Sequence, residues 1–507
     1  MTLKRLSRRE FLKASAFVVP AISLPGCLGT RMSPGEKAKP NLVFILADQW
    51  RAQSTGYAGN TDVQTPNLDS LSKESVKFTT VVSGCPVCSP YRASLLTGQY
   101  WLTHGIFHND KPLSNKATSI AQAYNQGGYD TGYIGKWHLN GHDKNTSLAE
   151  GRQAFIPKDR RQGFGFWRAC ECTHDYNNSL YYADTDERLY WNGYDAILET
   201  QEAIRYIREH KSGSPFALFL SWGPPHDPYH TAPQKYQEKF KEPGKLTLRP
   251  NVPVAKTNEA RKDLAGYYAH IAALDDCAGK IVRTLQECNI EDNTILVFTS
   301  DHGDMLYSQG QTSKQRPWDE SILVPFLLRY PAKLGNAVRR PQADKGKVVD
   351  VPINTPDIMP TILGLSSVDI PESCEGKDYS AVITGAESAG GCLTAKRMVE
   401  KAALIMCPVP FHQWNYKKGG REYRGVRTKR YTYVRDIKGP WLLYDNDIDP
   451  YQLTNLCDEP KYRDLQSWLD KLLNEKLEET NDRFLTGQEY MRLWDYEWDR
   501  DDAPIKI

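Results

Sequence analysis

Four short apolar runs, each followed by a cluster of polar residues, constrain the fold of this chain more than any other feature. They are residues 41–47, 133–134, 216–220 and 294–299. Continuous apolar runs are typical of parallel strands that are covered on both faces. Helical patterns lie between them, around residues 66–75, 116–127, 196–210 and 258–288. The alternation predicts an α/β fold, a mostly parallel sheet flanked by helices.

The polar clusters contain residue types that bind metals and transfer protons. Ligands of open α/β sheets bind beyond the carboxyl ends of the strands, so we expect the clusters to meet at one edge of the sheet. They are Asp48-Gln49, Gly135-Lys136-Trp137-His138, Pro224-Pro225-His226-Asp227-Pro228-Tyr229 and Asp301-His302-Gly303-Asp304. One polar strand end is ordinary, whereas four on one edge predict an assembled site.

The length of 507 residues favours two domains. Residues 39–385 are predicted to form the larger, catalytic α/β domain, and residues 386–507 a smaller C-terminal α+β domain. Within the latter, residues 423–434 and 441–444 have the pattern of an antiparallel sheet, and residues 459–478 that of a closing helix.

Residues 139–195 interrupt the alternation with a stretch rich in Asn, Asp, Tyr, Arg and Gly. A segment of this size is either a disordered excursion or a wall of the binding site. Its aromatic content favours a wall near the active site. The aromatic residues concerned are Trp167, Tyr176, Tyr181, Tyr182, Tyr190 and Trp191.

The N-terminal residues 1–27 have the pattern of an export signal. Residues 7–13 resemble a twin-arginine motif, and the apolar segment that follows is too short to span a bilayer as a stable helix. Leu24-Pro25-Gly26-Cys27 resembles a lipobox, in which Cys27 would carry the lipid, although Pro25 is unusual there. Residues 28–38 are a tether. We expect export by the twin-arginine translocase to the periplasm or, as a lipoprotein, to the cell envelope, with membrane contact only through the lipid anchor.

The formal net charge of +2 argues against nucleic-acid binding driven by bulk electrostatics. An anionic substrate would have to be held by a local cationic pocket. Beyond Cys27 the chain has ten scattered cysteines, and no disulfide pairing can be deduced from their spacing.

Cys88 is expected at the N-terminus of a helix. Pro90 suits the first helical turn, and Gly98 is placed as a C-terminal cap. Such an N-terminus is a ready binding site for a tetrahedral anion. Two other interpretations are a buried structural cysteine and Cys85-x-x-Cys88 as half of a zinc site or a redox pair. No second Cys-x-x-Cys is present, because Cys170 and Cys172 are separated by one residue.

The stretch Cys88-Ser89-Pro90-Tyr91-Arg92 resembles the modification signature of the sulfatases, in which the cysteine is oxidised to formylglycine. The resemblance extends from about residue 39 to residue 460, and Tyr91 departs from the usual small residue. It implies an alkaline phosphatase-like fold. It also implies hydrolysis of sulfate esters through a formylglycine–sulfate covalent intermediate, with the formylglycine-generating machinery as a partner.

The resemblance also implies a metal site. It places a cation on Asp48, Gln49, Asp301 and His302, together with the formylglycine oxygen of residue 88. Hard oxygen ligands favour Ca²⁺, with Mg²⁺ as the alternative. Gln49 stands where a second Asp is frequent in the family, and His302 stands where Asn is frequent. For Asp301 alone, a strand-end cap is the simpler interpretation.

The remaining catalytic roles are likewise implied by the resemblance. Lys136 and Lys314 would hold the sulfate, and His226 with Lys314 would protonate the leaving oxygen. Arg92 would fix the aldehyde hydrate, and His138 would be the base that releases sulfate from residue 88. A solvated loop remains the alternative for Lys314, and a structural role the alternative for each histidine.

Sulfated saccharides are the expected substrate class. Regions offered as sugar contacts are Asn109-Asp110, His174-Asp175, Trp414, Arg421 and Arg424. Two other functions are compatible with the same residues. One is a phosphodiester or phosphonate monoester hydrolase of the same superfamily. The other is a catalytically silent lipoprotein that binds sulfated glycans, which the intact set of lysines and histidines argues against.

Overall fold

The computed structural model describes residues 39–141, 147–331, 348–384 and 402–496, within a compact unit that begins at Lys39. The export signal, the lipobox and the tether predicted for residues 1–38 lie outside the described residues, as does the predicted domain boundary after residue 385. None of the described helices is long and apolar enough to cross a membrane.

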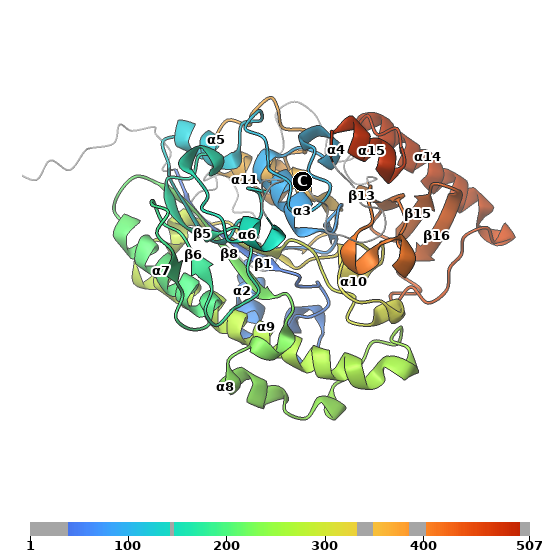
Figure 1. The fold of residues 1–507 in the computed structure, drawn as a ribbon, viewed down its shortest axis with the longest axis horizontal. Helices are drawn as coiled ribbons and strands as arrows, with labels where there is room; N and C mark the ends of the chain where they lie inside the picture. Colours follow the sequence, from blue (N-terminus) through green and yellow to red (C-terminus); the bar gives the residue numbers. More distant parts are fainter. Residues whose placement is uncertain (1–38, 142–146, 332–347, 385–401, 497–507) are drawn as a thin grey trace, which may run out of the picture. The chain divides into compact units, whose positions relative to one another are not determined.

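An eight-stranded sheet forms the centre of this unit (Figure 1). Its strands are β1 (Asn41–Asp48), β2 (Val76–Phe78), β4 (Asp130–Lys136), β5 (Phe166–Cys170), β8 (Phe216–Pro225), β9 (Thr294–Ser300), β10 (Phe326–Arg329) and β11 (Val348–Val349). They are ordered β11-β2-β10-β9-β1-β8-β4-β5. Only β10 pairs antiparallel with its neighbours, β9 and β2. The sheet is therefore mostly parallel, and each of the four predicted apolar runs lies in one of its strands.

Helices cover both faces of the sheet. The helices of this region are α2 (Pro66–Glu74), α3 (Cys88–Thr97), α4 (Trp101–His104), α5 (Ile120–Gln126), α6 (Leu148–Arg152), α7 (Asp195–His210), α8 (Gln234–Gln237), α9 (Thr257–Glu287), α10 (Asp319–Ile322), α11 (Thr355–Leu365) and α12 (Ser380–Thr384). Alternate residues of β1 enter two cores: Phe44 packs with α3, α5 and α11, whereas Ile45 packs with α2, α7 and α9. This two-sided burial explains why the strand is apolar throughout.

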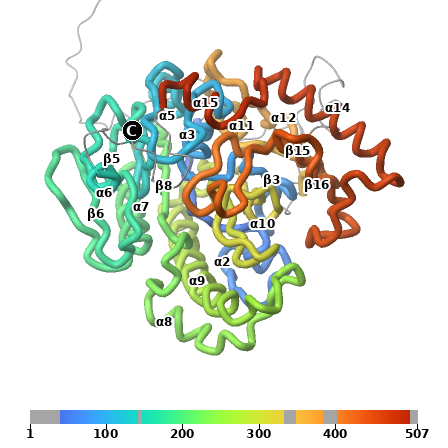
Figure 2. The backbone as a smooth tube through the Cα atoms, turned by 45° about the vertical axis from the view of Figure 1, so that its right-hand side comes forward, coloured from blue at the N-terminus to red at the C-terminus, as the bar shows by residue number. Residues whose placement is uncertain are grey.

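A four-stranded antiparallel sheet follows in the C-terminal region. Its strands are β13 (Ala403–Cys407), β14 (Tyr423–Arg427), β15 (Tyr431–Asp436) and β16 (Gly439–Asp445), and the helices after it are α14 (Arg463–Glu479) and α15 (Gly487–Leu493). The strands pair in chain order. Figure 2 shows α14 beside β15 and β16, and Leu469 and Leu473 of α14 share a core with Tyr433. The predicted antiparallel strands and closing helix are confirmed, whereas β13 was not predicted.

The described residues of the segment 139–195, which are 139–141 and 147–195, have a defined structure. Its strand β5 joins the central sheet beside β4, and a two-stranded sheet forms from β6 (Leu180–Tyr181) and β7 (Leu189–Tyr190). Trp167 and Tyr176 are fully buried, so part of the aromatic content serves packing. Two further short strands, β3 (Val81–Val82) and β12 (Ile353–Asn354), pair in parallel next to α3 and α11.

Helix α3 has the limits that its sequence predicts. Cys88 is its first residue, and Gly98 caps its C-terminus with φ +65°, in the left-handed region that favours glycine. All ten residues of α3 are buried. The helix therefore points its N-terminus, and Cys88 with it, into the interior at the edge of the central sheet.

Candidate functional site

The four polar strand ends meet at one edge of the sheet, as predicted. Asp48 ends β1, Lys136 ends β4, His226 follows β8 and Asp301 follows β9. These strands are neighbours in the order β9-β1-β8-β4 and run parallel, so their carboxyl ends coincide. The N-terminus of α3 adds Cys88 to the same place.

The side chain of Arg92 connects the ends of these strands through hydrogen bonds. Its guanidinium donates to Asp48 Oδ2 at 3.1 Å and to Asp301 Oδ2 at 3.3 Å. The other terminal nitrogen donates to the carbonyl oxygen of Lys136 and to the hydroxyl of Ser221, both at 2.7 Å. One side chain, 2% exposed, thereby ties four strands to α3. Ser221 lies inside an otherwise apolar strand and could not be identified as a site residue from the sequence pattern.

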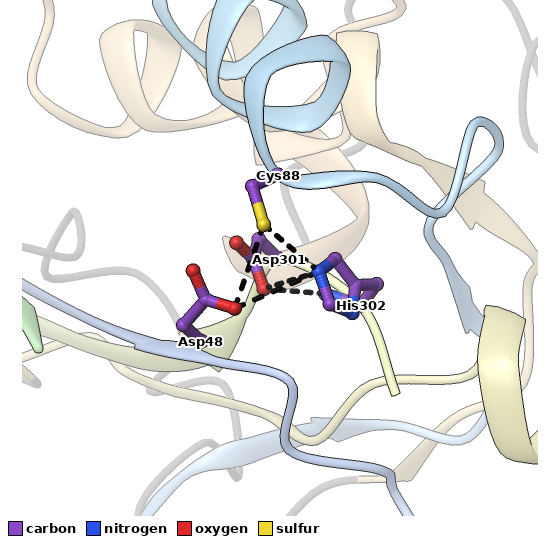
Figure 3. A group of neighbouring side chains, drawn as sticks. All are labelled: Asp48, Cys88, Asp301 and His302. Carbon is purple, nitrogen blue, oxygen red and sulfur yellow. Dashed lines mark hydrogen bonds and ion pairs between the residues drawn. The ribbon is translucent and has the colours of Figure 1, made fainter. Parts of the chain in front are cut away.

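Four side chains form a cluster that could hold a metal ion (Figure 3). Asp48, Cys88, Asp301 and His302 point toward one another, and one ligand atom from each lies within 4.8 Å of all the others. All four side chains are buried. The Sγ atom of Cys88 lies 3.6 Å from Asp48 Oδ1 and 3.3 Å from His302 Nε2.

The donor set of this cluster fits a divalent cation. His302 Nδ1 is 2.9 Å from the carbonyl oxygen of Gly303 and donates to it, which leaves the lone pair of Nε2 for the cluster. Gln49 donates its amide nitrogen to Asp304 Oδ2 at 2.7 Å. Its Oε1 is buried and has no hydrogen-bond partner among the described residues, as expected for a ligand atom. Carboxylate and amide oxygens with one imidazole suit Ca²⁺ or Mg²⁺.

Two lysines flank Cys88. Lys314 Nζ lies 3.0 Å from its Sγ and Lys136 Nζ lies 3.8 Å from it, and both lysines are buried. The solvated-loop interpretation of Lys314 is therefore wrong. Burial and the charge of Asp48 raise the pKa of the Cys88 thiol, but the nearby cations, first Lys136 and then Lys314, hold it well below its usual range.

His226 is held neutral beside Lys314. Its Nδ1 donates to the carbonyl oxygen of Asp227 at 2.9 Å, so its Nε2 accepts from Lys314 Nζ at 2.9 Å. Burial and the charge of Lys314 hold the pKa of His226 well below its ordinary value. His174 stacks on the His226 ring with centroids 4.7 Å apart, a neighbour that the sequence pattern did not reveal beyond a general candidate region.

His138 lies on the loop after β4, with its backbone at φ +57° and its ring 2% exposed. Its amide donates to the carbonyl oxygen of Glu171 at 2.7 Å. The Glu171 carboxylate in turn accepts hydrogen bonds from the amides of Leu139, Asn140 and Gly141, at 2.9–3.2 Å. The sequence did not identify Glu171, whose role depends on the loop that it meets.

Two of the offered sugar contacts are wrong. Arg424 is fully buried and ion-paired with Asp482 inside the C-terminal region. Trp414 is 2% exposed and packs in a core with Tyr423. Both side chains are thus engaged in packing and ion pairing inside the protein, away from the strand-end residues of the site. All nine cysteines in the described part of the chain are free thiols, and Cys85 is not part of the metal-ligand cluster.

Two family models match this chain. The family model described as Sulfatase matches residues 40–368, and the model described as N-sulphoglucosamine sulphohydrolase, C-terminal, matches residues 309–479. Together they span the central sheet and the antiparallel sheet, including every residue of the strand-end site.

Individual proteins are similar over nearly the whole chain. The ulvan-active sulfatase of Formosa agariphila is 42% identical over 468 residues, which cover 91% of this chain and 85% of that protein. The endo-4-O-sulfatase of Bacteroides thetaiotaomicron is 28% identical over 510 residues, covering 88% and 95%. A solved structure from work on glycosaminoglycan metabolism by Bacteroides thetaiotaomicron has a TM-score of 0.77 and 26% identity, covering 90% and 99%.

Proposed function

The chain belongs to the sulfatase family, and its homology identifies it as a sulfuric ester hydrolase. On that premise we propose that it removes sulfate from a sulfated carbohydrate, with residue 88 as the nucleophile. One observation carries the proposal: Cys88 Sγ lies 3.0 Å from Lys314 Nζ and 3.3 Å from His302 Nε2, at the N-terminus of a buried helix. A sulfate group at this point would meet the two lysine cations and the positive end of the α3 dipole together.

We further propose that Cys88 is converted to formylglycine by the modifying machinery of the host. The hydrate of that aldehyde would supply the oxygen that attacks sulfur. The Cys88 thiol marks where this oxygen would stand, between the cluster of acidic and histidine ligands and the two lysines. Arg92 supports this position indirectly, because it fixes both carboxylates of the cluster.

Asp48, Gln49, Asp301 and His302 are proposed to hold Ca²⁺, with Mg²⁺ as the alternative. The bound cation would polarise the sulfate oxygens and favour the ionised nucleophile. The chain's own lysines add to this effect. Lys136 and Lys314 would neutralise the sulfuryl oxygens, and their burial strengthens the attraction because little water screens it.

Lys314 and His226 are proposed to protonate the leaving alcohol together. Because His226 Nε2 accepts from Lys314 Nζ, the lysine carries the proton of this pair. His226 is itself fixed through its bond to the Asp227 carbonyl. Protonation matters most for alkyl sulfates such as sugar esters, since a sugar alkoxide is a poor leaving group.

The name of the ulvan-active relative makes ulvan the first substrate to test. For location, we propose twin-arginine export of the folded protein to the periplasm or the cell envelope, with Cys27 as the lipid-bearing residue. The support for this is the sequence of residues 1–27.

Two measurements on the protein from its native host test the proposal. A mass spectrum of the peptide that contains residue 88 should show formylglycine, and a panel of sulfated polysaccharides should release inorganic sulfate. An active enzyme that retains cysteine at position 88 would disprove the covalent chemistry. Faster turnover of aryl phosphonate or phosphodiester than of aryl sulfate would favour the alternative hydrolase.

A further inference from the structure

Asp110 shares its carboxylate between His138 and Arg152. Asp110 Oδ1 accepts from His138 Nε2 at 3.1 Å and from Arg152 Nε at 3.0 Å, and Oδ2 accepts from Arg152 Nη2 at 3.0 Å. The three residues come from separate segments: the loop after α4, the loop after β4, and the last turn of α6. The segment 139–195 thus reaches the site through Arg152, in addition to Glu171 and His174.

This geometry fixes the tautomer of His138. His138 Nε2 faces the carboxylate of Asp110, which also accepts from Arg152 and can only accept hydrogen bonds. This ring nitrogen therefore carries the hydrogen. The other ring nitrogen, Nδ1, is buried and makes no hydrogen bond within the part of the chain that the structure describes. Burial lowers the pKa of His138, but Cys172, Asp110 and Cys88 raise it to about 10 while residue 88 is a cysteine. When the ring is neutral, Nδ1 is therefore the nitrogen that offers a lone pair.

The same geometry argues against a direct sugar contact by Asp110. Asp110 is 9% exposed, and both of its carboxylate oxygens already accept hydrogen bonds from other residues of the protein. Arg152 shares the compensation of the carboxylate charge with His138: burial raises the pKa of Asp110, but His138 and Arg152 together hold it below its ordinary value. The side chain of Arg152 is 29% exposed, which places it between the interior and the solvent.

We propose that Asp110, supported by Arg152, is a positioning residue that holds His138 in the tautomer able to accept a proton at Nδ1 when sulfate is released from residue 88. The inference rests on the proposed function. In this step Nδ1 takes the proton of the second hydroxyl on residue 88. The electron pair of that O–H bond forms the carbonyl, and sulfate leaves with the electron pair of the C–O bond that breaks.

The test is Asp110→Asn in the full-length enzyme, with an aryl sulfate as substrate. Asparagine offers one oxygen, for which Arg152 competes, and its NH₂ group can donate to His138 Nε2 and reverse the tautomer. Attack on sulfur is then preserved and release is slowed. We expect a burst of phenol equal to the enzyme concentration, then a steady-state kcat lower by roughly 10²-fold or more. Intact mass should show a sulfuryl group retained on residue 88.

Two further variants make the test specific. Arg152→Met should show the same retained sulfuryl group with a smaller fall in kcat, and its partial exposure favours folding if Asp110→Asn is unstable. Asp184→Asn is the matched control, because Asp184 pairs with Arg161 in the same segment at 3.4 Å and its side chain is 77% exposed. This variant should behave as the wild type.

The outcomes separate the inference from the function. If the wild type carries formylglycine and neither Asp110→Asn nor Arg152→Met retains a sulfuryl group, the inference is wrong. A raised KM for glycans with unchanged kcat on the aryl sulfate would overturn it in favour of a sugar contact. An active wild type with unmodified Cys88 would overturn both the proposed chemistry and this inference.

Discussion

Lys136 Nζ lies 2.6 Å from Asp48 Oδ2, and both side chains are buried. The pair joins the carboxyl ends of β4 and β1 across the intervening strand β8. Burial raises the pKa of Asp48, but the charge of Lys136, first among several cations, holds it well below its usual range. The lysine therefore serves the fold as well as any bound sulfate.

Replacing Lys136 by Met should destabilise the protein as well as inactivate it. Removal of one member of a buried ion pair costs about 3–5 kcal/mol when the other charge is left unpaired, and because Arg92 still pairs with Asp48 we expect the lower end of that range. Urea unfolding measures this loss. Arg430→Met is the control, because Arg430 lies at the same 2.6 Å from Asp445 but is 43% exposed. An equal loss in both variants would show that the burial of the Lys136 pair has no special effect.

Calcium should stabilise the protein through the cluster in Figure 3. A ligand at 100 times its Kd that binds only the folded state adds about 2.7 kcal/mol. Thermal melting in EDTA, followed by titration with Ca²⁺ or Mg²⁺, measures the shift. Asp301→Asn should abolish the response, whereas Asp69→Asn, remote from the cluster, should retain it. A response of equal size in Asp301→Asn would place the binding elsewhere.

His226→Ala should impair sugar sulfates more than activated aryl sulfates. The pair Lys314 and His226 is proposed to protonate the leaving oxygen, and a nitrophenolate leaves without that help. We expect kcat/KM to fall by roughly 10²-fold or more for an alkyl or sugar sulfate, and much less for nitrophenyl sulfate. A series of aryl sulfates of increasing phenol pKa would show a steeper dependence in the variant. An unchanged slope would contradict the proposed role.

Glu171 should make stability fall as pH rises through neutrality. Burial raises the pKa of its carboxyl from 4.5 to about 7. A raised folded-state pKa means that the native state holds the proton more tightly, so the contribution is full below pH 4.5 and is lost as pH rises through about 7. The shift corresponds to about 3 kcal/mol. Urea unfolding at pH 5 and pH 8 should show a loss of stability in the wild type that is smaller by this amount in Glu171→Gln, which retains the contribution of Asp195, another carboxyl whose pKa burial raises to about 7.

The four main strands could be predicted because helices cover both of their faces. Strands such as β1 are then apolar at every position, which is visible in one sequence. The strands β2, β10, β11 and β13 were not predicted. They are short, of two to five residues, and their pairing is set by partners far away in the chain. No local pattern distinguishes β10 from a buried turn.

The strand-end residues of the site could also be predicted, because the parallel order of the strands places their carboxyl ends together regardless of side-chain conformation. The supporting residues could not. Each of them acts through a partner from another segment of the chain. Ser221 accepts from Arg92, Glu171 accepts from the loop after His138, and Asp110 accepts from Arg152. Such meetings depend on loop paths and on side-chain reach, which carry no periodic signal. Trp414 and Arg424 failed as sugar contacts for the same reason, since their burial is a tertiary property.

The burial of α3 determines whether modification of Cys88 can occur before or after folding. Cys88 is 1% exposed, Arg92 is 2% exposed, and Pro90 between them is buried as well. An enzyme that recognises these three side chains cannot reach them once the chain has folded and Arg92 has bound the ends of the strands. If Cys88 is converted to formylglycine, as proposed above, the conversion would take place on the nascent or unfolded polypeptide. A molecule that folds first would keep its thiol, so the active fraction of a preparation would depend on the relative rates of folding and modification.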